Sequence, residues 1–309
     1  MKRLAPGLIA ALLLAGVSAS YARETHRKKP HRGKPAVAAP AEAPIDMRVM
    51  TFNLMCDFCD KGGTKGTFDE RLALVADTIN RHDPDLISLQ ELRTRGQVES
   101  LLARLKEKYT PIFAGGFLAS YPDPTLFVRA SRFTVETKDG FWLGPSSPWF
   151  GFGWKTSFPR RVEYAELLDG KSGGHFVFAG THFDNNPRNR DPSAELVVKK
   201  FAASGTPVIF AGDTNLRPDR PGYAALSSAF RDAFVEAKTY SYVANGSMIP
   251  TDGCNLEKAS TFPECRVDHV FLSRSAPWRV RRWAVDTFRY PQSNGFISDH
   301  RAVIVELSR

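Results

Sequence analysis

The sequence has few cysteines, few long apolar runs and none of several well-known catalytic motifs. Its 309 residues include only 4 cysteines, too few for a fold held together mainly by disulfides. It contains neither the complete P-loop pattern nor H-E-x-x-H, which argues against P-loop NTPases and metalloproteases of that type. With 42% hydrophobic and 24% charged residues, it has a globular composition, which excludes collagen-like, coiled-coil and wholly disordered chains.

The excess of positive charge is concentrated at the amino terminus. The chain has 42 Lys and Arg against 33 Asp and Glu, a formal net charge of +9. Residues 1–44 contain 8 of the basic and 2 of the acidic residues, a net charge of +6, so the remaining residues carry only +3. The folded part is mildly basic, which weakens the electrostatic argument for a nucleic-acid partner.

The amino terminus has the pattern of an export signal. A short basic start precedes an almost continuous apolar run over residues 4–19, and Ser-Tyr-Ala at 20–22 supplies small residues for a cleavage site. Residues 1–22 are therefore predicted to be a signal peptide of an exported, periplasmic or secreted protein; a membrane anchor is the alternative. Residues 23–44, rich in Lys, Arg, Pro and Ala, are predicted to be a disordered basic linker. No transmembrane anchor is expected after cleavage, because no later apolar run is long enough.

Export favours disulfides over free thiols. Cys56 and Cys59 have C-x-x-C spacing, whereas Cys254 and Cys265 flank a loop, and four cysteines allow three pairings. A four-thiolate zinc site and a redox role for Cys56 and Cys59 are the alternatives. We expect a structural role, with a Cys254–Cys265 disulfide closing the loop.

Residues 45–309 are predicted to form one α/β domain, because no second linker-like stretch divides them. Apolar residues at helical spacing predict helices over 68–81, 97–108 and 192–203. Strand-like runs outnumber the helices and lie at 47–53, 86–89, 125–128, 161–168, 175–181, 207–211, 267–272, 280–287 and 302–307. They occur in consecutive and in helix-separated pairs, which predicts a four-layered α/β sandwich of two mixed sheets with helices outside.

Polar and acidic side chains recur where the apolar strand-like runs begin or end. They are Asn53, Glu91, His182, Asp184, Asp213, Asn215, Asp268, His269, Asp299 and His300. Each alone is typical of a turn, a cap or a packed histidine. Loops held at strand ends by a rigid sheet position catalytic groups well, so the set is a candidate active site.

The set suits the chemistry of phosphate esters. Oxygen ligands from Glu91, Asn53 and Asp299 would hold a hard divalent cation, Mg²⁺ or Mn²⁺. Asp213 and Asn215 could orient a water for in-line attack. A histidine held by a carboxylate can serve as a base or as a stabilising cation; the candidates are His182 and His300, with Asp268 and Asp184 as spare carboxylates.

Six short motifs occur in order between about Met47 and Leu307. They are Thr51-Phe-Asn53, Gln90-Glu91, Thr181-His-Phe-Asp184, Gly212-Asp-Thr-Asn215, Arg266-Val-Asp-His-Val-Phe271 and Ser298-Asp-His-Arg301. Together they resemble the endonuclease/exonuclease/phosphatase superfamily, which has the DNase I-like fold. The middle of the chain, with Arg160-Arg161 and Arg190, is similar to bacterial members of this superfamily.

The resemblance implies a two-sheet sandwich with the active site at one end. It implies Glu91 as the principal metal ligand, with Asn53 and Asp299 close to the ion or the phosphate. Catalytic roles fall to His182, Asp213, Asn215, Asp268 and His300, and phosphate binding falls to Arg161 and Arg190. Some nucleases of the superfamily have an acidic ligand two residues after the first Asn, where this chain has Met55, so a second metal on that strand is not expected.

The substrate is the least determined property. A metal-dependent phosphodiesterase or phosphatase, acting as a monomer, is the first hypothesis, with nucleic acid as one candidate substrate. A sphingomyelinase-like or phosphoinositide-directed lipid hydrolase is the alternative. The aromatic stretch at 148–154 could stack on bases, but it could equally enter a membrane, and a phospholipid headgroup could then occupy the site. A non-catalytic anion-binding module on the same fold is the third hypothesis.

Overall fold

The structure, a computed structural model, describes residues 46–63, 65–114, 122–145, 154, 158–243, 266–293 and 295–309. The chain divides into two units, Met1–Glu42 and Ala43–Arg309, and all described elements belong to the second. The predicted signal peptide, the predicted linker, Cys254 and Cys265 therefore lie outside the described residues. Among the helices that the structure describes, none is both long enough and apolar enough to cross a membrane.

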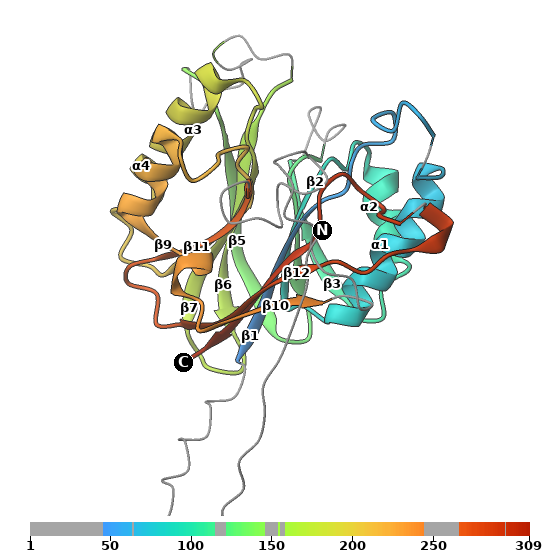
Figure 1. The fold of residues 1–309 in the computed structure, drawn as a ribbon. Helices are drawn as coiled ribbons and strands as arrows, with labels where there is room; N and C mark the ends of the chain where they lie inside the picture. Colours follow the sequence, from blue (N-terminus) through green and yellow to red (C-terminus); the bar gives the residue numbers. More distant parts are fainter. Residues whose placement is uncertain are drawn as a thin grey trace, which may run out of the picture. The chain divides into compact units, whose positions relative to one another are not determined.

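Two mixed β-sheets form the centre of the second unit (Figure 1). One sheet has the order β10 (Thr239–Val243), β12 (Arg279–Asp286), β13 (Val303–Ser308), β1 (Met47–Asn53), β2 (Leu86–Gln90), β4 (Thr125–Arg129), β3 (Tyr109–Ile112). The other has the order β5 (Phe133–Trp142), β6 (Arg161–Asp169), β7 (His175–His182), β8 (Val208–Asp213), β11 (Asp268–Ser273), β9 (Phe230–Asp232). The pairs β1–β2, β7–β8 and β10–β12 are parallel, and the other neighbouring pairs are antiparallel.

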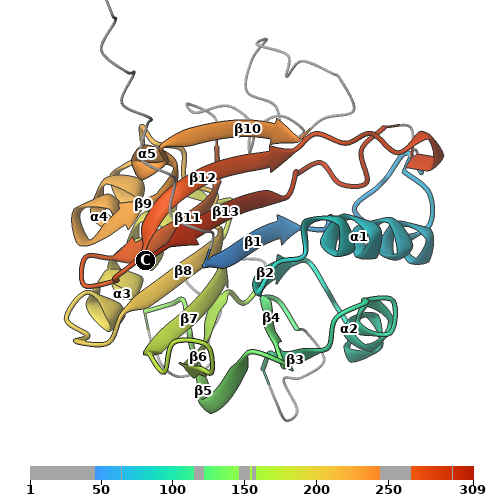
Figure 2. The same cartoon turned by 90° about the horizontal axis from the view of Figure 1, so that it is seen from below.

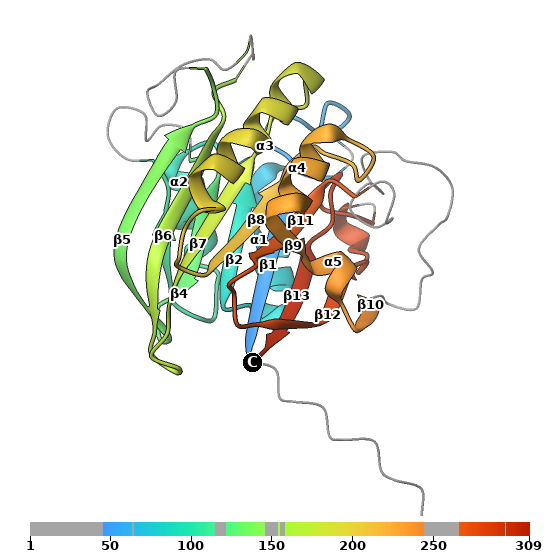
Figure 3. The ribbon, with the colours of Figure 1, turned by 90° about the vertical axis from the view of Figure 1, so that its left-hand side faces the viewer.

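Helices cover the outer faces of both sheets (Figures 2 and 3). The helices are α1 (Phe68–His82), α2 (Arg95–Leu102), α3 (Pro187–Phe201), α4 (Pro221–Ala229), the short α5 (Ala233–Glu236) and the 3₁₀ turn η2 (Pro291–Ser293). Three apolar clusters separate the layers: one between the sheets, one under α1 and α2, and one under α3 and α4. The predicted four-layered sandwich is confirmed, since each sheet buries apolar side chains on both of its faces.

Local sequence explains where the helices begin. Thr67 and Glu70 form a reciprocal capping box at α1, which ends within one residue of its predicted end. The third helix begins at Pro187, five residues earlier than predicted at 192. The Asn186 side chain accepts from the backbone of the first turn there, and proline is favoured at that position. The helix predicted over 97–108 covers Arg95–Leu102, and residues 103–108 form turns and bends before β3 begins at Tyr109.

The two sheets approach each other closely near the functional end. The Ser88 hydroxyl on β2 donates to the Ala211 carbonyl on β8 at 3.0 Å. Gly180 on β7 makes this contact possible, because a Cβ there would lie 2.5 Å from the Ser88 Oγ. The carboxyl ends of β1, β2, β7 and β8 are thereby brought to one end of the sandwich.

Candidate active site

Asp213, the last residue of β8, lies at the centre of the site. Its Oδ2 accepts a hydrogen bond from Asn53 Nδ2 at 3.0 Å. The same oxygen lies 3.6 Å from His182 Nε2 and 3.7 Å from His300 Nε2. Its Oδ1 accepts from the backbone N–H of Asn215 at 2.8 Å. One buried carboxylate therefore connects four of the predicted residues, which come from strands far apart in the sequence.

His300 is held by a carboxylate on the opposite side of its ring. Its Nδ1 lies 2.8 Å from Asp268 Oδ2, and strand register places Asp268 directly opposite Asp213. Burial opposes protonation of the ring, but the Asp268 and Asp213 carboxylates outweigh it and hold the pKa of His300 well above its usual range. A protonated His300 can donate a hydrogen bond from Nε2.

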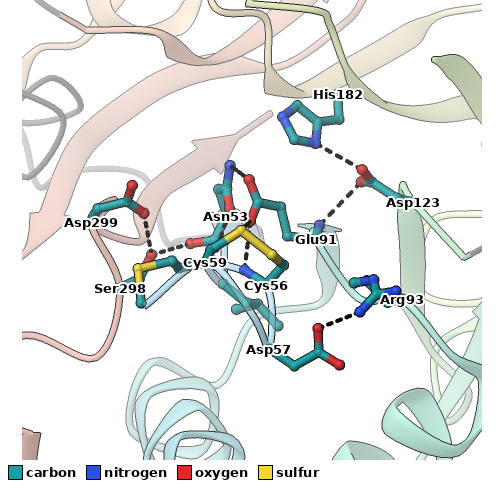
Figure 4. Close-up of a disulfide and its surroundings, with 12 residues drawn as sticks. Asn53, Cys56, Asp57, Cys59, Glu91, Arg93, Asp123, His182, Ser298 and Asp299 are labelled. Atoms are coloured by element: carbon teal, nitrogen blue, oxygen red, sulfur yellow. Dashed lines mark hydrogen bonds and ion pairs between the residues drawn. A yellow bond between two sulfur atoms is a disulfide. The ribbon is translucent and has the colours of Figure 1, made fainter. Parts of the chain in front are cut away.

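His182 has a corresponding support that the sequence analysis missed. Its Nδ1 lies 2.8 Å from Asp123 Oδ2, and Arg160 Nη1 lies 3.0 Å from the same oxygen. Burial raises the pKa of Asp123, but His182, Arg160 and the N–H of Glu91 together lower it below its usual value. The available signal for Asp123 was its position between two prolines, just before a strand-like run. Its Oδ1 also accepts a hydrogen bond from the backbone N–H of Glu91 (Figure 4).

Glu91 follows β2 and is fixed by the turn after β1. Its Oε2 accepts from the backbone N–H of Cys56 at 2.6 Å, and its Oε1 accepts from Asn53 Nδ2 at 3.2 Å. Cys56 and Cys59 form a disulfide, and Cys59 Sγ lies 3.6 Å from the same Oε2 (Figure 4). This pairing is one of those left open by the sequence, and it leaves Cys254 and Cys265 as the remaining two cysteines.

Backbone conformation is unusual at the same place. Of the four non-glycine residues with left-handed φ in the described part, Met55 (55°), Glu91 (71°) and Asn215 (52°) lie in this site, and the fourth, Asp83, caps the end of α1. Side chains other than glycine adopt this region at a cost, and such residues gather where surrounding contacts impose the conformation. Here the left-handed conformation turns the chain sharply where the chain leaves β1, β2 and β8.

Ser298 connects the carboxyl-terminal motif to β1. Its hydroxyl donates to the Asn53 carbonyl at 2.7 Å and accepts from the N–H of His300 at 3.0 Å. Its Oγ also lies 3.4 Å from Asp299 Oδ1. Asp299 is partly exposed, and Ser298 connects it to Asn53 (Figure 4).

The two predicted phosphate-binding arginines lie in different places. Arg190 on α3 donates to the Asn215 carbonyl, at the edge of the site. Arg161 instead pairs with Glu163 and stacks on Trp142, with its Cζ 4.7 Å from the ring centroid. Successive side chains of an extended chain point to opposite sides, so Arg160 reaches His182 while Arg161 is directed away from the site. Of the residues predicted to bind metal or phosphate or to act in catalysis, the structure places Arg161 away from the site. His269, from the wider set of strand-end residues, also lies away from it, with its Nε2 2.9 Å from the Leu216 carbonyl.

A cavity of about 250 Å³ opens beside these groups. Glu91, Arg160, His182 and both cysteines of the disulfide line it. Phe58, Arg93 and Phe158 line it as well, among others. The site is thus accessible to a ligand from the side of Glu91 and His182.

The donor set fits a hard divalent cation. Glu91, Asp213 and Asp299 offer carboxylate oxygens, and the buried Asp268 Oδ1 has no hydrogen-bond partner among the described residues. Asn53 as placed orients Glu91 and Asp213 through Nδ2, while its Oδ1 accepts from Met55. Ligand atoms of Asp213, Asp268 and His300 lie within 4.8 Å of one another, and a second such group joins Glu91 with the disulfide sulfurs. Since disulfide sulfurs are not thiolates, oxygen is the donor at Glu91.

The family model described as Endonuclease/Exonuclease/phosphatase family matches residues 50–300. The chain belongs to this family. The matched segment includes every residue of the candidate site, and members of the family generally use divalent metal ions. A comparison with curated protein sequences found no significant match.

Solved structures share the fold over nearly their whole length. A family protein from Bacteroides thetaiotaomicron is 24% identical, with a TM-score of 0.71, and the match covers 86% of this chain and 96% of that one. A mannosyl-6-phosphatase from the same organism is 25% identical, with a TM-score of 0.70 and coverage of 85% and 100%. TDP2 from D. rerio, complexed with a single-strand DNA product, is 18% identical, with a TM-score of 0.62 and coverage of 85% and 99%. The predicted superfamily and DNase I-like architecture are confirmed.

Proposed function

We propose that this protein is an exported, divalent-metal-dependent hydrolase of phosphoric esters, with a phosphodiester as its first candidate substrate. The proposal depends on one observation above all: Asp213 Oδ2 lies within 3.7 Å of the Nε2 atoms of both His182 and His300. Two histidines with their own carboxylate partners thus face one carboxylate. The Cys56–Cys59 disulfide supports export, because such bonds persist in oxidising compartments.

The residues divide the work of in-line hydrolysis between them. Asp213, with Asn215 beside it, accepts a proton from the attacking water and orients it. His300, charged through Asp268, donates from Nε2 to an oxygen of the phosphate, and His182 binds a second oxygen. Glu91 and Asp299 would hold Mg²⁺ or Mn²⁺, and when bound the ion would supply positive charge against the phosphate. Arg190 adds positive charge at the rim.

A metal-dependent activity screen tests the proposal. The protein lacking residues 1–22 is assayed with single- and double-stranded DNA, RNA, sphingomyelin, inositol phosphates and sugar phosphates, with Mg²⁺, with Mn²⁺ and with EDTA. We expect hydrolysis of at least one class, its loss in EDTA, and a fall of about 10²–10⁴-fold in Glu91→Ala and His300→Ala. Unchanged hydrolysis in EDTA and in both variants would contradict the proposal.

Phosphomonoester hydrolysis is the second candidate, because a solved structure 25% identical to this chain is a mannosyl-6-phosphatase. The sugar phosphates in the screen test it directly. The lipid alternative depended on the stretch 148–154, of which only Trp154 is described. Binding of phosphate esters without turnover of any of them would favour the non-catalytic module instead.

A further inference from the structure

Two exposed phenylalanines line the active-site cavity. Phe58 is 56% exposed and Phe158 is 48% exposed, and both line the cavity of about 250 Å³ that contains Glu91 and His182. The large hydrophobic side chains exposed in the described part are these two, Val235 and Tyr240. Two of these four exposed side chains therefore lie beside the groups proposed to hydrolyse a phosphate ester.

Phe58 is held in place although it is exposed. It lies between the two cysteines of the disulfide, in the turn whose Cys56 N–H binds Glu91. The Arg93 guanidinium covers its ring, with Cζ 4.5 Å from the centroid, and Asp57 holds Arg93 at 2.7 Å. A ring fixed by a disulfide and a cation has little conformational freedom to lose when a ligand stacks on it.

Charge beside the rings distinguishes among possible ligands. Arg93 and Arg160, each paired with an aspartate, line the same cavity as Phe58 and Phe158, and the carboxylates of Glu91 and Asp184 line it too. An acyl chain placed there would cover guanidinium groups without forming hydrogen bonds, which is unfavourable. A planar ring joined to a phosphate satisfies both features, since aromatic side chains and arginine stack on its face and the cations attract the phosphate.

We propose that Phe58 and Phe158, with Arg93, form a subsite that binds the base of a nucleotidyl phosphate ester next to the scissile phosphate. This rests on the proposed function and narrows its substrate class. Base stacking on aromatic residues does not depend on base identity, so the subsite favours the presence of a base and not a particular sequence. Recognition of the ring is then separate from the chemistry of Asp213 and His300.

Kinetics with matched substrates test the subsite. The mature protein and the variants Phe58→Ala, Phe158→Ala, Phe58→Trp and Val235→Ala are compared on a deoxydinucleotide and on its abasic analogue. We expect each Phe→Ala change to raise KM for the dinucleotide by about ten-fold, with a much smaller effect on the abasic analogue. Phe58→Trp should retain the wild-type KM. Val235→Ala, at an exposed apolar position outside the cavity, should not differ from wild type.

Binding separates the subsite from turnover. Calorimetry measures thymidine 5′-monophosphate and ribose 5-phosphate with the same proteins in Mg²⁺. We expect tighter binding of the nucleotide, and loss of this preference in Phe58→Ala and Phe158→Ala. A preference that persists in both variants, or equal binding of the two ligands by the wild-type protein, overturns the subsite. This conclusion holds even if the protein hydrolyses sugar phosphates or lipids. Nucleotide preference that depends on Phe58, without hydrolysis of any ester, overturns the proposed function and supports the subsite.

Discussion

Two buried histidines near Asp268, His300 and His269, have pKa values that are shifted in opposite directions. His300 lies 2.8 Å from Asp268 Oδ2, and its pKa is held well above the usual range by Asp268 and Asp213 against the effect of burial. His269 follows Asp268 directly in β11, so its side chain points to the other face of the sheet. There burial lowers its pKa to about 4, and Asp232 only partly offsets this at 3.9 Å from Nδ1.

The difference shows what makes a buried histidine useful for catalysis. Both rings are almost fully buried, and each histidine belongs to a short polar segment next to apolar strand residues. His269 donates from Nε2 to the Leu216 carbonyl and stays neutral among the rings of Tyr223 and Phe271. A carboxylate at hydrogen-bonding distance, with a second one on the far side of the ring, converts the same residue type into a cation.

Removing the two rings in turn should give the largest contrast. We expect His300→Ala to lower kcat/KM by about 10²–10⁴-fold, because it removes the charged donor at Asp213. His269→Gln should keep activity within a small factor of wild type once protein is normalised for folding. Initial rates on whichever phosphate ester the screen identifies, with circular dichroism as a folding control, make the measurement. An equal loss of kcat/KM in His300→Ala and His269→Gln would show that both histidines support the structure and that His300 has no special part in catalysis.

Replacing the carboxylate beside His300 should shift the pH profile of activity, whereas replacing the carboxylate beside His269 should not. His300 is protonated below its raised pKa, so activity that needs its proton is lost as pH rises through that value. Asp268→Asn removes the main charge that raises the pKa, and we expect the alkaline limb of kcat/KM to shift toward lower pH. Asp232→Asn, beside His269, serves as the matched control and should leave the limb in place. A limb that does not move in Asp268→Asn would assign it to another group.

The two histidines should also affect stability in opposite directions. The pKa of His269 falls from 6.5 in the unfolded chain to about 4 in the folded protein, so stability is lost as pH falls through this interval. The loss attributable to this group approaches about 3 kcal/mol below pH 4. His300 contributes stability below pH 6.5 that is lost as pH rises through its folded pKa. Urea unfolding at several pH values should show a smaller acid loss for His269→Gln than for wild type. Parallel curves would contradict the assignment.

The smallest expected effect concerns how the two halves of the site are supported. Asp268, in strand β11, holds His300, whereas Glu91 is held by the disulfide turn through the Cys56 N–H. We expect Cys56→Ser/Cys59→Ser to lower kcat/KM by only several-fold and to raise the Mg²⁺ concentration needed for half-maximal rate. Metal titration of the oxidised protein and of the double variant measures this. Identical titrations would mean that the turn holds Glu91 without the disulfide.

Much of the site could be predicted because its residues lie at the ends of recognisable strands. Asn53, Glu91, His182, Asp213 and His300 each border an apolar run, and a sheet brings such positions together. Asp123 and Arg160 were harder to find, because their contacts with His182 and with each other join residues that are distant in the sequence. Which of two adjacent arginines faces the site depended on the residue at which β6 begins.

The sequence by itself determined the alternation of strands and helices, the four-layered class and the family, because apolar periodicity and ordered motifs are local properties of the chain. Tertiary structure alone decided the protonation of the histidines, because charge depends on which carboxylates lie within hydrogen-bonding distance after folding. Asp268 and His269 are neighbours in the chain, yet the pleat of β11 sends one to the reacting end and the other into the packing beneath α4.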